Sequence, residues 1–178
     1  RRRLYQAMDV TGVKSADAMY VSPITWKNPQ TREKRSLLII GFNPDKPAFD
    51  FPEVNRQVDR INQPDVLLFD SKARGTYDRV IADVKVGKTV TTEIERRTIS
   101  VGGLFQLGSS FGADGHLMTS QDNYLRLFPR KPQGSINIGL LQVKSGYDPK
   151  QVAATLVAYL PKEDVRVMTK QEFIDFER

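Results

Sequence analysis

The sequence predicts an α+β protein in which one α/β subdomain is built from both ends of the chain and a mostly β subdomain is inserted between them. Strand and helix patterns alternate in the first third of the 178 residues and return near the end. Residues 88–107 are instead rich in threonine, isoleucine and valine, which is typical of strands. Prolines and a glycine in residues 129–134 mark a boundary. The predicted limits are 1–72 and 131–178 for the split subdomain and 73–130 for the inserted one.

The first part of the split subdomain is expected to hold two helices and three strands. Apolar residues at helical spacing predict helices over residues 2–10 and 52–62. Pro52 suits the first position of the second helix. Runs of β-branched and other apolar residues predict the strands, which are 13–24, 36–42 and 66–69.

The inserted subdomain is expected to begin with a β-hairpin. Its strands, 88–94 and 98–107, flank a turn at Glu95-Arg96-Arg97. The elements that follow are a glycine- and serine-rich loop at 108–115, a short strand at 117–119 and a helix at 120–128.

The second part of the split subdomain is expected to contain a strand at 136–144, a helix at 149–160, a strand at 165–168 and a last helix from Thr169. Asp148 can accept the first free amides of the helix that begins at Pro149. Thr169 and Glu172 have the spacing of a capping box.

Composition excludes several classes of protein. The chain has no cysteine and one histidine, His116, so a structural zinc site or a histidine-ligated iron centre is not expected. The net charge of +6 favours acidic partners, but the basic residues are dispersed, so nucleic acid is not an expected partner. The longest uncharged stretch, 98–113, is too short and too rich in glycine to span a bilayer. We expect a soluble, excised piece of a larger protein, since three arginines rather than a methionine begin it.

Candidate catalytic motifs do not add up to an enzyme. Residues 108–112 fit the Gly-x-Ser-x-Gly pattern of a hydrolase, but no helix is expected to follow Ser110, and the only histidine lies six residues away. Asp70, Asp78 and Asp83 have basic neighbours, which favours solvated ion pairs over acid–base catalysis. The prediction is no catalytic residue, no metal and no cofactor.

Two aromatic residues leave an alternative open. Phe111 lies in a loop of small and polar residues, and Trp26 lies in a polar turn region. Each side chain either folds back into the protein or projects as an anchor for a partner.

The sequence resembles the DevC-type permeases of MacB-like ABC exporters, within the FtsX-like permease family. The resemblance rests on residues 100–115, on Ser120-Gln121-Asp122-Asn123-Tyr124, on Leu127-Phe128-Pro129 and on Gly41-Phe42-Asn43-Pro44, with support from 156–176. It implies the domain between the first two membrane helices of a permease, with a porter-like α/β part and an inserted, sabre-like β-rich part.

The resemblance also implies a function and partners. The domain would dock an HlyD-like membrane-fusion adaptor and relay ATP-driven motion for the export of a lipid-like substrate, a glycolipid in DevC members. A separate ABC ATPase subunit, a TolC-like outer-membrane duct and a second permease copy would complete the assembly. The expected location is the periplasmic face of the inner membrane of a Gram-negative-type bacterium, a cyanobacterium. The alternative function is an anionic-lipid binding or sensor domain.

Two groups of residues are the predicted sites. The adaptor-docking residues are Ser109, Ser110, Phe111, Gly112, Ala113, Asp114 and Gly115. The membrane-proximal residues are Arg1, Arg2, Arg3, Phe176 and Arg178, where the arginines would bind acidic head groups.

Overall fold

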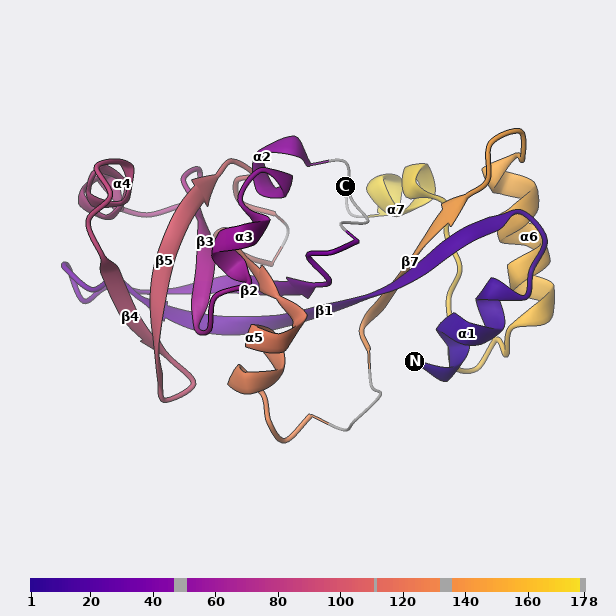
Figure 1. Ribbon diagram of the computed structural model, residues 1–178, viewed down its shortest axis with the longest axis horizontal. Helices are drawn as coiled ribbons and strands as arrows, with labels where there is room; N and C mark the ends of the chain where they lie inside the picture. Colours follow the sequence, from indigo (N-terminus) through magenta and orange to yellow (C-terminus); the bar gives the residue numbers. More distant parts are fainter. Residues whose placement is uncertain (47–50, 111, 132–135, 177–178) are drawn as a thin grey trace. The chain divides into compact units, whose positions relative to one another are not determined.

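The computed structural model describes residues 1–46, 51–110, 112–131 and 136–176 and divides into two compact units (Figure 1). Unit 1 comprises Arg1–Ala18 and Gly134–Arg178, and unit 2 comprises Met19–Gln133. The mixture of helices with a seven-stranded mixed sheet confirms the predicted α+β class. Both ends of the chain belong to unit 1, as a split subdomain requires.

Unit 1 contains helices from both ends of the chain. Its elements are α1 (Arg2–Met8), the first residues of β1 (Val13–Lys27), β7 (Ile138–Val143), α6 (Pro149–Tyr159) and α7 (Lys170–Phe176). Strand β7 follows β1 in the strand order, and Lys144 N donates to Gly12 O at 2.7 Å just beyond them.

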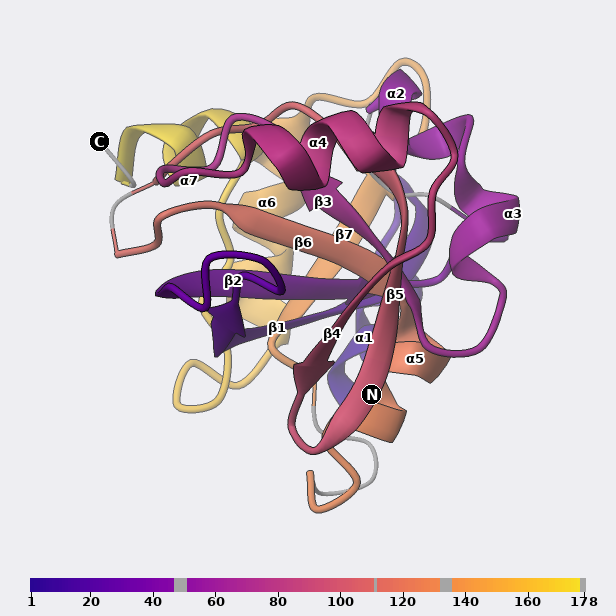
Figure 2. The same ribbon diagram turned by 90° about the vertical axis from the view of Figure 1, so that its left-hand side faces the viewer.

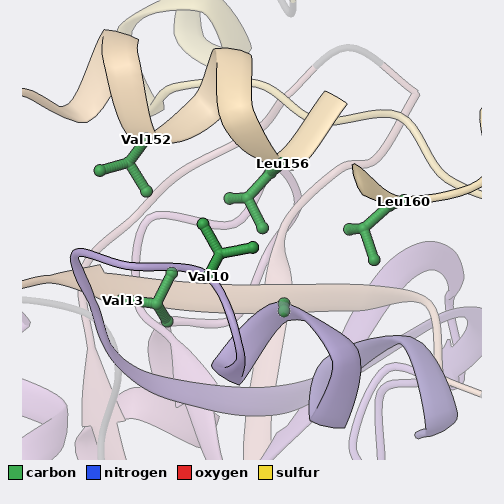
Figure 3. Packing of buried hydrophobic residues seen from close by; sticks show 6 residues of the cluster. Val10, Val13, Val152, Leu156 and Leu160 are labelled. Carbon is green, nitrogen blue, oxygen red and sulfur yellow. The ribbon is translucent and has the colours of Figure 1, made fainter. Parts of the chain in front are cut away.

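The core of unit 1 is a cluster of small aliphatic side chains. Val10 and Val13, which follow α1, face Val152 and Leu156 of α6 (Figure 3). These side chains are at most 7% exposed. The cluster therefore joins segments about 140 positions apart in the sequence, so neither end of the chain has a full core without the other.

Both predicted helix starts in unit 1 are confirmed. Asp148 accepts from Lys150 N at 3.0 Å, and Pro149 is the first residue of α6. Thr169 and Glu172 form the capping box, with Thr169 N donating to Glu172 Oε2 at 2.7 Å and Glu172 N donating to Thr169 Oγ1 at 3.2 Å. The strand predicted at 165–168 is wrong, because Val165 and Val167 pack on the unit 1 core without strand pairing.

Unit 2 holds most of the sheet, in the order β4-β5-β3-β6-β2-β1 (Figure 2). Strands β3 and β5 are parallel, as are β2 and β6, and the other pairs are antiparallel. The remaining strands of the unit are β2 (Lys34–Phe42), β3 (Val66–Asp70), β4 (Val90–Ile94), β5 (Arg97–Phe105) and β6 (His116–Ser120). Its helices are α2 (Pro52–Asn55), α3 (Val58–Ile61), α4 (Asp78–Lys85) and α5 (Gln121–Leu127).

The division between the units differs from the predicted one. Residues 19–72 lie in unit 2 and not with the chain ends, because β2 pairs with β6 and β3 pairs with β5 and β6. The second limit lies after Gln133, close to the predicted position after residue 130.

Two further differences concern helices. The single helix predicted over 52–62 is broken into α2 and α3 at Gln57, whose Nε2 donates to Leu104 O at 2.7 Å and to Glu53 O at 3.0 Å. Helix α4 was not predicted at all. The β4–β5 hairpin is as predicted, and Glu95 and Arg96 both have positive φ, which gives the turn the twist that flanking strands prefer.

Replacing Leu156 by alanine tests the unit 1 core. Leu156 is 2% exposed, so Leu156→Ala leaves a cavity and should lower the free energy of unfolding by about 2–5 kcal/mol. Val157, its neighbour on the outer side of α6, is 40% exposed, so Val157→Ala should change the free energy of unfolding by less than about 0.5 kcal/mol. Chemical denaturation followed by circular dichroism measures both, and equal losses would contradict this account of the core.

Candidate functional site

The predicted docking residues, 109–115, lie at the end of the unit 2 sheet where two parallel strands finish and two others begin. Strands β3 and β5 end there, at Asp70 and Phe105. Because β6 runs antiparallel to β3 and parallel to β2, both β6 and β2 start at the same end. We call residues 109–115 the docking loop; Phe111 is outside the described residues, so its anchor or plug role stays open.

Asp70 is buried and holds the backbone just before the docking loop, at Leu107 and Gly108, by hydrogen bonds. Its carboxylate is 0% exposed and accepts from Lys72 N at 3.0 Å, Leu107 N at 3.0 Å and Gly108 N at 2.8 Å. Burial raises the pKa of Asp70, but His116 and these backbone N–H groups outweigh it and hold the pKa below its ordinary value. The interpretation of Asp70 as a solvated ion pair is therefore wrong.

His116, the first residue of β6, forms a hydrogen bond through each nitrogen of its ring, one to Gly108 and one to Ser110. Nδ1 lies 2.9 Å from Gly108 O, which can only accept, so Nδ1 carries the proton in the neutral ring. Nε2 is then the acceptor for the Ser110 hydroxyl at 3.3 Å. Nδ1 also lies 3.6 Å from Asp70 Oδ2, too far for a good hydrogen bond.

The second half of the docking loop is held by backbone hydrogen bonds. Asp114 N donates to Ser36 O at 2.9 Å, Leu38 N donates to Gly115 O at 3.0 Å, and Arg74 N donates to Asp114 O at 2.6 Å. A Cβ on Gly115 would lie 2.9 Å from Ala73 Cα, so the chain passes too close there for a side chain. These contacts fix Asp114 and Gly115 at the end of the sheet.

A shallow hollow of about 290 Å³ opens beside the loop. Arg35 and Arg74 flank the Asp114 carboxylate, at 3.9 and 3.6 Å. The lining is polar, which suits hydrogen bonding to a partner more than capture of an apolar ligand. The lining residues are Ser36, Arg74, Ser110, Gly112, Ala113 and Asp114.

The docking loop thus offers only some of its predicted residues to a partner. Ser109, Ser110 and Gly112 are exposed, Asp114 is half-buried, and Ala113 and Gly115 are buried. The buried residues position the loop, and docking itself remains a prediction.

The predicted membrane-proximal residues lie in unit 1. Arg1 and Arg2 are exposed at the start of α1. Arg3 Nη2 forms an ion pair with Asp164 Oδ2 at 2.5 Å, which ties α1 to the turn after α6. The side chain of Phe176 and all of Arg178 are outside the described residues.

The structure brings Ser110, His116 and Asp70 together in the order of a hydrolase triad, which sequence reasoning missed. A usable signal was present, since Asp70 directly follows an apolar strand and is placed at its carboxyl end. The arrangement nevertheless fits a structural role better than a catalytic one. We call the hydrogen bonds that Asp70 and His116 make to the strand ends and the docking loop the Asp70 clamp. Three backbone N–H groups occupy the Asp70 oxygens, and Gly108 O, not Asp70, is the nearest partner of His116 Nδ1.

The other candidates have structural roles. Trp26 is fully buried and packs on Phe69 with ring centroids 5.1 Å apart, which confirms the folded-back alternative. Asp83 pairs with Lys88 at 3.2 Å, as expected of a surface ion pair. Within the described ranges, no group of histidine, cysteine and acidic residues could hold a metal ion, and no helix has the length and apolar character needed to cross a bilayer.

Asp70→Asn tests the clamp. The amide is a weaker acceptor and cannot satisfy all three N–H groups, so unfolding should become easier by about 3 kcal/mol at pH 7. Since the folded pKa lies below the ordinary value of 3.8, the wild type should keep this stability above about pH 4 and lose it as pH falls further. Denaturation between pH 2.5 and 7 should show a shallower acid slope for Asp70→Asn. Asp59→Asn, at an exposed position of α3, is the control, and an equal loss there would refute a special role for Asp70.

A serine-directed phosphonate probe tests whether Ser110 is an activated catalytic serine or only part of the Asp70 clamp. We expect no labelling of Ser110, because the His116 ring is buried and is oriented by a carbonyl rather than by a carboxylate. Mass spectrometry of the treated protein measures this, with Ser110→Ala as the blank. Stoichiometric labelling that disappears in Ser110→Ala would show an activated serine.

Comparisons with known proteins point to extracytoplasmic domains of ABC transporters. No protein-family model matches the sequence, and no curated protein sequence is significantly similar to it. The structure superposes on the extracellular domain of the noncanonic ABC-type transporter YknZ from Gram-positive bacteria with a TM-score of 0.56 and 17% identity, covering 95% of this chain and 88% of that one. The periplasmic region of MacB from Actinobacillus actinomycetemcomitans gives 0.52 and 14%, covering 98% and 80%. The chain therefore has the fold of a MacB-like extracytoplasmic permease domain, and the resemblance seen in the sequence holds at the level of fold.

Proposed function

We propose that this chain is the extracytoplasmic domain of an ABC exporter permease, which docks a membrane-fusion adaptor and relays ATP-driven motion to it. The fold likeness to the MacB and YknZ domains, over nearly the whole chain, is the observation that carries the proposal. At 14–17% identity this likeness establishes architecture only, so the function is inferred from the fold together with the surfaces described above.

The division of the chain supports a relay. Both chain ends belong to unit 1, while the docking loop belongs to unit 2. Strand β1 starts in unit 1 and ends in unit 2, so a continuous strand links the two. We propose that unit 1 is the porter-like part, next to the membrane through Arg1–Arg3, and that unit 2 carries the sabre-like part with the docking loop.

The partners follow from the same proposal. The adaptor would be HlyD-like, the ATPase would be a separate ABC subunit, and a TolC-like duct would continue the path across the outer membrane of a Gram-negative-type, cyanobacterial cell. The permease would act as a homodimer on a lipid-like substrate such as a glycolipid. In this assembly the domain binds and positions its partners, and the chemistry of ATP hydrolysis takes place in the ATPase subunit.

Ser109→Trp tests the docking loop. Ser109 is exposed and its side chain makes no described hydrogen bond, so the indole should leave the fold intact but obstruct a partner. In the complete exporter we expect adaptor binding to weaken at least tenfold and export to fall with it. Thr89→Trp, at another exposed loop position of unit 2, is the matched control.

Two outcomes would count against these ideas in different ways. Unchanged adaptor binding by Ser109→Trp would refute the docking role of the loop and would not affect the exporter assignment. No binding of any adaptor by the wild-type protein, with export unaffected when residues 19–133 are removed from the permease, would refute the exporter assignment.

A further inference from the structure

The chain passes between the two units twice, and the residues that flank these crossings in unit 2 contact each other. Tyr20 of β1 lies two positions after Ala18, the last residue of the first segment of unit 1, and Lys131 lies two positions before Gln133, the last residue of unit 2. The Lys131 ammonium nevertheless lies over the Tyr20 ring, 5.6 Å from its centre. Both crossings are therefore tied to the same place inside unit 2.

A second tyrosine belongs to this place. Lys131 Nζ donates a hydrogen bond to Tyr124 Oη at 3.0 Å, and the rings of Tyr20 and Tyr124 stack with their centres 5.3 Å apart and their planes at 27°. The Tyr124 hydroxyl is also hydrogen-bonded to the hydroxyl of Ser22, on the same strand as Tyr20. An ammonium within about 6 Å of an aromatic ring is attracted to the ring face, and a charged donor makes a stronger hydrogen bond than a neutral one. We call Tyr20, Tyr124 and Lys131 the tyrosine cluster.

The two rings form a fixed support for the lysine. Tyr20 is 1% exposed and Tyr124 is fully buried. Gly41, the residue of β2 that pairs with Tyr20, passes so close that a Cβ on it would lie 2.5 Å from Tyr124 Cβ. Phe128 packs on Tyr124 with ring centres 4.7 Å apart, and its carbonyl oxygen accepts from Lys131 N at 3.1 Å. Lys131 is only half-buried, so its side chain can leave this support without exposing the core.

We propose that the tyrosine cluster is a hinge point of unit 2, at which Lys131 holds the two crossings together and thereby limits the movement of unit 1 relative to unit 2. Movement between compact units of one chain is the general expectation for domains. Two connections that are held at one place restrict this movement to rotation about that place, whereas a released connection also lets the units slide. The cluster is a property of unit 2 by itself. That its hinge serves the transmission of motion in an exporter rests on the proposed function.

The absence of cysteine from the sequence allows a direct test with spin labels. Ala82 on α4 of unit 2 and Ala154 on α6 of unit 1 are both exposed. With nitroxides on Ala82→Cys/Ala154→Cys, double electron–electron resonance measures the distribution of distances between the units. Lys131→Met keeps the aliphatic stem but loses the cation, so it should release the second crossing and broaden this distribution. Lys34→Met, at an exposed position of β2, is the matched control and should leave the distribution unchanged.

Hydrogen exchange followed by mass spectrometry measures the release of the segment itself. Loss of a hydrogen bond from a charged donor should make opening about tenfold more frequent, so the amide at position 131 should exchange about tenfold faster in Lys131→Met. Tyr124→Phe keeps the stacked rings and removes the acceptor, so it should speed exchange at the same position. Lys131→Arg keeps the cation and a donor, so it should preserve both the slow exchange and the narrow distance distribution.

Four results would overturn the proposal. Unchanged exchange in Lys131→Met would mean that the cluster does not hold the segment. Faster exchange with an unchanged distance distribution would make the cluster a local contact and not a hinge. Equal broadening in Lys34→Met would indicate an effect of net charge, and a Lys131→Arg variant that behaves like Lys131→Met would remove the role of the cation. These measurements use the chain without adaptor or ATPase, so failure of the hinge and failure of the exporter assignment are distinguishable.

Discussion

The end of the unit 2 sheet depends on the hydrogen bonds that the buried Asp70 carboxylate accepts. A charge with no solvent exposure is tolerated only when hydrogen bonds replace its hydration, and the N–H groups of Lys72, Leu107 and Gly108 do so. Two of these donors follow β5 and one follows β3, so the carboxylate ties the ends of two parallel strands to each other. His116 then carries the same clamp into β6 and the docking loop. A partner that binds at Ser109 would therefore contact a segment in which the neighbouring residues Gly108 and Ser110 are hydrogen-bonded to Asp70 and His116.

Unit 1 depends on a different constraint, which is apolar. Its core has members only from the two ends of the chain, and the whole of unit 2 lies between them in the sequence. Bringing such distant segments together costs loop entropy, so the contact of Val10 and Val13 with Val152 and Leu156 must be strong enough to offset it. The split arrangement is thus maintained by packing. Any force applied to α1 acts on the same core that holds α6.

Sequence reasoning succeeded where local signals agree with the tertiary fold. The caps at Asp148 and Thr169 form as predicted, and the turn predicted at Glu95-Arg96-Arg97 forms at Glu95 and Arg96, with Arg97 already in β5. These features need only nearby residues. Sequence reasoning failed where a contact with residues distant in the sequence determines the local structure. Gln57 breaks a well-patterned helix because it reaches the backbone of β5, and Val165 and Val167 look like a strand but pack on a core.

The predicted limit after residue 72 failed for the same kind of reason. Local patterns group 1–72 with the end of the chain, because both segments alternate strands and helices. Strand pairing instead places β2 and β3 in unit 2, since β2 pairs with β6 and β3 pairs with β5 and β6. The hydrogen bonds of Asp70 could not be predicted for the same reason, because two of its three donors lie 37 and 38 residues away in the sequence. The docking loop could be chosen from its composition, but which of its residues are buried could not.

Two hollows, one in each unit, differ in the side chains that line them. The hollow beside the docking loop is polar, with Arg74 and Asp114 paired across it, and suits a protein surface that supplies complementary hydrogen bonds. The unit 1 groove is instead lined by four aliphatic side chains together with Lys162 and Arg166. Because the Asp70 clamp and the unit 1 core share no residue, either surface can change without disturbing the support of the other.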